Sequence, residues 1–198
     1  MLIFKKEKSN KIFESRIISI VGKDENVKVE YIKELAQYLK RKNKKITIIN
    51  LNYFDNLEKI KIKNVIINPL NKILLKNNKK IEEIEFDNYL ERLKKEFNYI
   101  IINNSIETFF ELNKISFKKS SKINVLINNN LNDFIYYYNL FKIYKNNLEI
   151  NLNYFYLIIY KIKNKKIKIK NIIPYFNNLI NNKIKINIFD RRYFGINK

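Results

Sequence analysis

The residues best placed to do chemistry follow the first apolar run of the chain. Gly22, Lys23 and Lys28 stand in a short segment, VGKDENVKV, between that run and an amphipathic stretch. A turn of this kind binds phosphate when several backbone N–H groups converge on the anion at a helix N-terminus and a lysine adds positive charge. The backbone path of such a turn requires glycines, and this segment has one. It therefore keeps the lysines of a phosphate site without the glycines.

Amide side chains follow the next apolar runs, where parallel strands would end. Asn50 and Asn52 stand in IINLN, and Asn103 stands in NYIIINNS. An amide neither takes up a proton as a base nor offers Mg²⁺ a negative charge. We therefore expect no catalytic residue and no metal site at these positions.

The composition excludes several classes of enzyme. The chain has neither cysteine nor histidine, so disulfides, thiolate metal sites and Ser-His or Cys-His hydrolases are ruled out. The beginning, MLIFKKEKSNKIF, has too short an apolar run for a secretory signal, and no uncharged stretch is long enough to span a bilayer. The sequence predicts a cytoplasmic protein.

The net charge of +21 is typical of proteins that bind nucleic acid or an anionic surface. An abundance of Lys, Asn and Ile also fits a coding sequence poor in G and C, which would explain the charge without any function. A concentrated basic strip is the candidate nucleic-acid or anionic surface; it consists of Lys163, Lys165, Lys166, Lys168 and Lys170.

The elements that must position these residues alternate along the chain. Apolar or β-branched runs predict strands at 17–21, 46–51, 99–102, 123–127 and 154–162. Helical spacing predicts helices at 27–41, 84–97, 106–117 and 132–144. Asn43 would end the first helix, and Asn132 would cap the fourth. The apolar stripe of the second helix would consist of Ile84, Leu90, Leu93 and Phe97.

This alternation predicts an α/β fold: a doubly wound, mostly parallel sheet with helices on both faces. We expect one domain over 1–198, with an N-terminal extension at 1–14 and a divergent basic part at 163–198. KIKNKKIKIKN alternates Ile and Lys with period two, as an edge strand would, and 184–188 repeats the pattern. The alternation equally fits a β-hairpin laid against the main sheet or a basic surface ribbon.

The segment from the first strand to the second resembles the ParA/MinD family of deviant Walker ATPases, whose P-loop reads K-G-G-x-G-K-[ST]. Aligned through LAQYLKRKNKKITIINLN, Lys23 falls on the family's signature lysine and Lys28 on its phosphate lysine. The family's strand ends resemble VLLIDLD and YDYIIIDTP, where this chain has IINLN and NYIIINNS. A similar strand-loop-helix-strand also occurs in flavodoxin-like and response-regulator-like domains.

The chain departs from the family pattern at the majority of the positions that bind phosphate or magnesium in the family. Asp24, Glu25 and Val27 replace glycines, and Val29 replaces the magnesium-binding hydroxyl. The resemblance therefore implies a pseudo-ATPase with no cofactor, or with ATP or ADP retained but not hydrolysed, and with no small-molecule substrate. The vestigial nucleotide site would consist of Gly22, Lys23, Lys28, Asn50 and Asn103.

NLNYFDNLEK and YIIINNSIETFFELNK look most like the TadZ/CpaE pilus-assembly branch of the family. This implies a scaffold or localisation module in pilus or secretion machinery, acting as a homodimer or with a protein partner, at the inner membrane or a cell pole. The alternative is a DNA-binding partition-type protein that uses its lysine-rich surface. A third hypothesis is weak membrane-surface contact through the final FDRRYFGINK.

Overall fold

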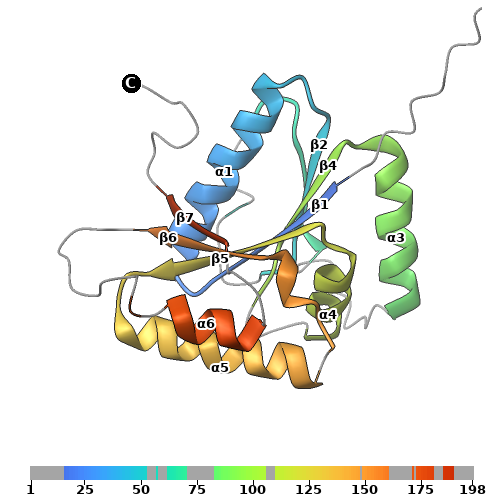
Figure 1. Cartoon of the computed structure of the whole chain (residues 1–198). Helices are drawn as coiled ribbons and strands as arrows, with labels where there is room; N and C mark the ends of the chain where they lie inside the picture. Colours follow the sequence, from blue (N-terminus) through green and yellow to red (C-terminus); the bar gives the residue numbers. More distant parts are fainter. Residues whose placement is uncertain are drawn as a thin grey trace, which may run out of the picture.

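The computed structural model describes residues 16–52, 57, 62–70, 83–105, 110–147, 149–160, 171, 173–180 and 185–189. These residues form a seven-stranded sheet with the order β3-β2-β4-β1-β5-β6-β7, and every neighbouring pair is parallel (Figure 1). The strands are β1 (Arg16–Gly22), β2 (Ile46–Asn50), β3 (Ile66–Asn68), β4 (Tyr99–Asn103), β5 (Lys122–Asn128), β6 (Phe155–Tyr160) and β7 (Lys185–Phe189).

Helices cover both faces of this sheet. They are α1 (Glu25–Arg41), α3 (Glu83–Glu96), α4 (Phe110–Lys119), α5 (Leu131–Asn147) and α6 (Ile173–Ile180). The α1 helix packs on one face of the sheet. The helices α3, α4, α5 and α6 pack on the opposite face, against the residues that alternate along the strands with those under α1. The predicted α/β class, with a doubly wound parallel sheet, is therefore confirmed.

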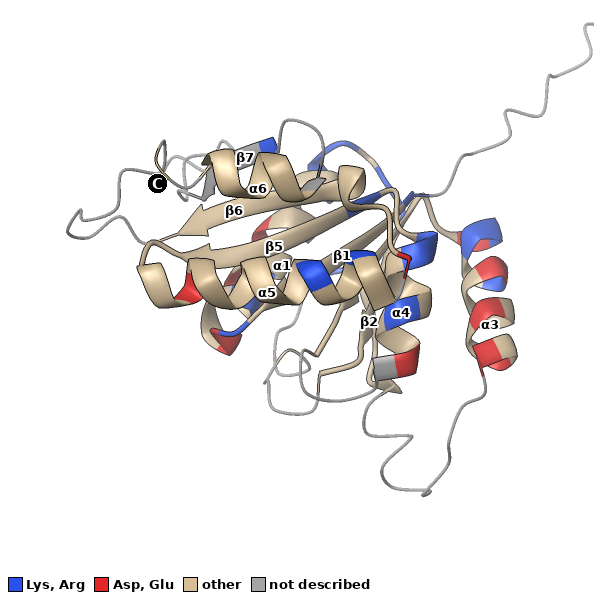
Figure 2. Ribbon diagram, turned by 60° about the horizontal axis from the view of Figure 1, so that its bottom comes forward, with Lys and Arg blue, Asp and Glu red and all other residues tan. Residues whose placement is uncertain are grey.

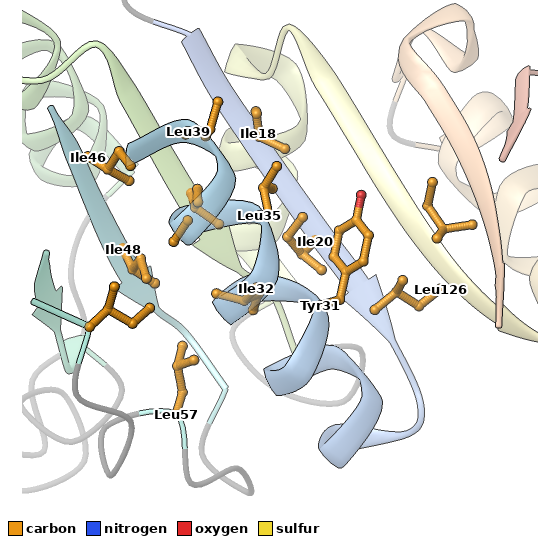
Figure 3. Packing of buried hydrophobic residues seen from close by; sticks show 14 of the residues in the cluster. Ile18, Ile20, Tyr31, Ile32, Leu35, Leu39, Ile46, Ile48, Leu57 and Leu126 are labelled. Atoms are coloured by element: carbon orange, nitrogen blue, oxygen red, sulfur yellow. The ribbon is translucent and has the colours of Figure 1, made fainter. Parts of the chain in front are cut away.

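The α1 helix forms where the apolar spacing predicts it. Its buried residues pack on the side chains of β1 and β2, as Figure 3 shows for Tyr31, Ile32 and Leu35. The Asp24 carboxylate caps the N-terminus by accepting a hydrogen bond from the Val27 N–H at 3.1 Å. At the other end Asn43 has a φ of 55°, a left-handed conformation that ends the helix as predicted.

Two local predictions are wrong in detail, and one strand was not predicted. Ile84 is 71% exposed, whereas Phe86 is fully buried with Leu90 and Leu93, because the helix turns a different stripe toward the sheet. The cap of α5 is Asn130, whose Oδ1 accepts from the Asp133 N–H at 2.9 Å, so the cap is not Asn132. The strand β3 was not predicted, since three residues carry too little periodicity.

In the C-terminal part, KIKNKKIKIKN lies outside the described residues except for Asn171, whereas the second period-two segment, 184–188, overlaps the edge strand β7. The helix α6 precedes β7, and β7 pairs in parallel with β6 through a register that joins Tyr156 to Lys185. A hairpin would pair the strands antiparallel, so the edge strand is present but is reached by a helical crossover. The extension at 1–14 and the basic strip from Lys163 to Lys170 lie outside the described residues.

Candidate functional site

The candidate site lies where β1, β2 and β4 end beside the N-terminus of α1. In open parallel sheets, ligands bind at these carboxyl ends. Asn50 and Asn103 are paired in the strand register, and Asn103 Nδ2 donates to Asn50 Oδ1 at 2.8 Å. Asn52 lies in the same cluster, because its backbone N–H donates to Asn50 Oδ1 at 3.1 Å. The tertiary structure thus brings together the amides that the sequence singled out.

Lys28 is the central residue of the site and is completely buried. Its ammonium lies 2.9 Å from Glu25 Oε2 and donates to the backbone oxygen of Asn104 at 3.1 Å. Glu25 Oε2 also accepts a hydrogen bond from Asn52 Nδ2. The positive charge that would meet a phosphate is therefore paired with a carboxylate of the chain's own first helical turn.

The turn before α1 does not have the shape of a phosphate-binding loop. β1 ends at Gly22 and α1 begins at Glu25, which leaves only Lys23 and Asp24 between strand and helix. A P-loop wraps an anion with several non-helical residues before its lysine. Here the Val27 N–H donates to the Asp24 carboxylate and the Lys28 N–H donates to the Asp24 backbone oxygen, so the chain itself uses two of the N–H groups at the start of α1.

Gly22 has a packing role in this structure. A Cβ atom at this position would lie 3.1 Å from the Cβ of Leu126 on the neighbouring strand β5, closer than side chains normally approach. The glycine therefore permits close contact between β1 and β5.

Lys23 is directed away from Lys28 and toward α5. Its ammonium lies 3.4 Å from the centroid of the Tyr136 ring, within the range of a cation–π interaction. Its backbone N–H donates to the Tyr137 hydroxyl at 2.9 Å, while burial raises the pKa of that hydroxyl well above its ordinary value. Of the five predicted site residues, Lys28, Asn50 and Asn103 are joined through Glu25 and Asn52, whereas the contacts of Lys23 and Gly22 are with α5 and β5.

Two of the contacts that define the site were not predicted from the sequence. The first is the pairing of Glu25 with Lys28, which their i, i+3 spacing in a helix could have indicated. The second is Asn104, a buried residue whose backbone oxygen accepts from Lys28 and whose Oδ1 accepts from Ser116 Oγ at 2.5 Å. No local pattern points to Asn104, since its contacts come from other elements.

Among the described residues, no three His, Cys, Asp or Glu side chains are grouped so that they could hold a metal ion. No helix in the same part of the chain has the length and apolar character needed to cross a membrane.

Comparison with solved structures identifies the fold. The chain superimposes on a ParA family ATPase from Chlorobium tepidum with a TM-score of 0.66 at 12% identity, covering 92% of this chain and 87% of that one. A chain of the MinC:MinD cell division protein complex of Aquifex aeolicus gives 0.62 at 14% identity, with 89% and 82% covered. A putative plasmid partition protein from Borrelia burgdorferi bound to AMPPNP gives 0.60 at 16%, with 93% and 92% covered.

No protein-family model matches the chain, and no curated protein matches it in sequence. The likeness is therefore one of fold: the chain has a ParA/MinD-like, P-loop NTPase-like architecture.

Proposed function

We propose that this chain is a ParA/MinD-like module that works by binding a protein partner and does not hydrolyse a nucleoside triphosphate. The observation that carries the proposal is the ion pair between the fully buried Lys28 and the partly exposed Glu25, 2.9 Å apart. A triphosphate could reach the Lys28 ammonium only by displacing Glu25, and the two anions would repel each other at short range.

The surrounding residues also do not suit a magnesium nucleotide. Val29 stands where the P-loop hydroxyl would bind the metal, and Asn50 and Asn103 stand where carboxylates would. The Asn50 side-chain oxygen is already used, because it accepts from the side chain of Asn103 and from the backbone of Asn52. The amides thus bind one another in an arrangement that supports a structural role.

The test combines ligand binding with turnover. A ligand that binds only the native state raises its melting temperature, so we expect no shift with ATP or ADP, with or without magnesium. We also expect no steady release of phosphate from ATP. Release that is abolished by Lys28→Ala would refute the proposal, because it would show that Lys28 reaches a triphosphate.

In more detail, we propose that the module positions pilus or secretion machinery, as proteins of the TadZ/CpaE branch do. It would act as a homodimer or with a protein partner, at the inner membrane or a cell pole. The MinC:MinD complex among the similar structures supports a protein partner for this fold. A fluorescent fusion that stays evenly distributed in cells, or loss of the gene without effect on surface structures, would count against this role.

A second candidate function is nucleic-acid binding, supported by the placement of the cations. In the described residues, many lysines and arginines lie where strands begin and helices end, with blue at one end of α4 and red at the other in Figure 2. Arg16, Lys122 and Lys185 begin strands and Lys45 directly precedes one, so they add positive charge to the edge of the sheet where the helices end. Binding to duplex DNA that weakens steeply with added salt would support this candidate, and no binding at low salt would remove it.

A further inference from the structure

The helix α5 has two apolar stripes, and only one of them is used in the core. Phe134, Tyr137, Phe141 and Tyr144 are buried against the sheet. A second stripe consists of Leu131, Ile135 and Tyr138, at i, i+4 and i+7, which share a face of a helix. Leu131 is 56% exposed and Ile135 is 51% exposed. An apolar stripe left in water beside a filled core indicates an interaction surface.

The helix α6 turns this stripe into a groove. It lies beside α5 (Figure 1), and Phe176 packs against Phe134, Tyr138 and Phe141 with ring centroids 5.6 to 6.4 Å apart. The Lys145 ammonium donates to the Leu179 backbone oxygen at 2.7 Å, which joins the C-terminal ends of the two helices. The groove has a volume of about 260 Å³, and its lining is entirely apolar or aromatic: Leu131, Phe134, Ile135, Tyr138, Tyr175 and Phe176.

The size and lining of the groove indicate the kind of occupant. Its volume is below the roughly 300–1,000 Å³ of small-molecule sites, and it lacks the convergent polar groups that orient a small ligand. The exposed residues of α5 span about two helical turns, or roughly 10 Å. An amphipathic helix presents apolar anchors at the same spacing and fits such a groove.

The charges around the groove distinguish between occupants. Lys142 continues the exposed stripe four residues after Tyr138, and its ammonium lies 4.8 Å from the centroid of the Tyr138 ring. Among the described residues, no carboxylate forms an ion pair with Lys142. Figure 2 shows α6 without a charged residue. A two-fold contact would place the same patch of both copies together, so it would add a second Lys142 and no acid, between chains of net charge +21 each.

We infer that the α5–α6 groove binds an amphipathic helix of a partner protein, with apolar residues in the groove and an acidic residue facing Lys142. The inference rests on the proposed function in one respect, since it names the surface by which a partner-binding module would act. The acid adds to binding because an opposite charge at the rim speeds association and selects the orientation of the helix.

The experiment uses the full chain and a phage-displayed library of helical peptides. We expect selected peptides to carry apolar residues at i, i+4 and i+7 with Asp or Glu near one end of that stripe. Ile135→Asp should weaken their binding at least about tenfold, because it places a charge in the groove. Ile143→Asp is the matched control: it lies on the same helix, is 45% exposed and is outside the groove, so binding should stay within about twofold.

Lys142→Glu completes the test by inverting the expected preference from acidic to basic peptides. Both Ile135 and Ile143 are about half exposed, so we expect both Asp variants to melt at the same temperature as the unaltered chain, which would show that folding is intact. The inference is overturned if no peptide is selected, if Ile135→Asp and Ile143→Asp behave alike, or if selected peptides lack acids. A dimer in sedimentation that Ile135→Asp dissociates would also overturn it, because the occupant would then be a second copy. None of these outcomes changes the nucleotide assays, so failure of this inference is distinct from failure of the proposed function.

Discussion

Glu25→Gln is the substitution that most directly tests the buried ion pair of the candidate site. The Lys28 side chain is fully buried and the Glu25 side chain is 33% exposed, with 2.9 Å between the charged atoms. At an effective dielectric constant of about 20, two unit charges at this distance attract by roughly 6 kcal/mol. Removing one partner of a buried pair costs about 3–5 kcal/mol, because the remaining charge stays buried without compensation.

Partial exposure of Glu25 places the expected loss at the lower end of that range, about 3 kcal/mol in the free energy of unfolding. For a chain of this size that corresponds to a fall in melting temperature of roughly 6–12 °C. Urea denaturation measures the loss as a lower midpoint with an unchanged slope.

The chain contains a matched control in another helix. Glu111 and Lys114 have the same i, i+3 spacing in the first turn of α4, but their charged atoms are 4.0 Å apart and the side chains are 61% and 30% exposed. Glu111→Gln removes the same charge beside the same helix terminus, so it should cost no more than about 0.5 kcal/mol. Equal losses for the two variants would refute the reasoning, since burial of Lys28 would then have no energetic consequence.

A double variant separates the charge from the packing. Glu25→Gln combined with Lys28→Met removes both members of the pair and keeps most of the buried volume. We expect it to recover much of the stability lost in Glu25→Gln, because an apolar side chain can replace a buried ion without leaving an unpaired charge. A double variant that is less stable than Glu25→Gln would contradict this explanation.

Three further predictions concern single contacts. Gly22→Ala should lower the free energy of unfolding by about 1–3 kcal/mol in urea denaturation, because the new Cβ would lie 3.1 Å from the Cβ of Leu126. An unchanged urea midpoint would show that β5 shifts to accommodate the added methyl group. Asn130→Ala should cost about 1 kcal/mol by removing the α5 cap, whereas Asn132→Ala should cost almost nothing, and the reverse order would refute the cap assignment. Burial raises the pKa of Tyr144, so the folded protein keeps a phenolic proton that the unfolded chain loses above about pH 10. The free energy of unfolding should therefore fall as pH rises past about 10. In thermal melts at several pH values, Tyr144→Phe should make this fall in stability with pH less steep.

Much of the secondary structure follows from local pattern. Apolar runs mark β1, β2, β4, β5 and β6, because buried parallel strands are apolar on both faces. The predicted strands lie within a few residues of those in the structure. The elements missed are the shortest strand and the shortest helix: β3 has three residues and α6 has eight.

The sequence by itself determined the alternation of strands and helices and the residue types at the strand ends, because periodicity, capping and side-chain chemistry are local properties. Only the tertiary structure decided that Lys28 is buried and bound to Asn104, that Lys23 turns toward Tyr136, and that α6 forms a groove with α5. These contacts join residues from elements far apart in the chain or depend on where a helix begins. Their energies depend on burial, which no single segment specifies before the sheet is assembled.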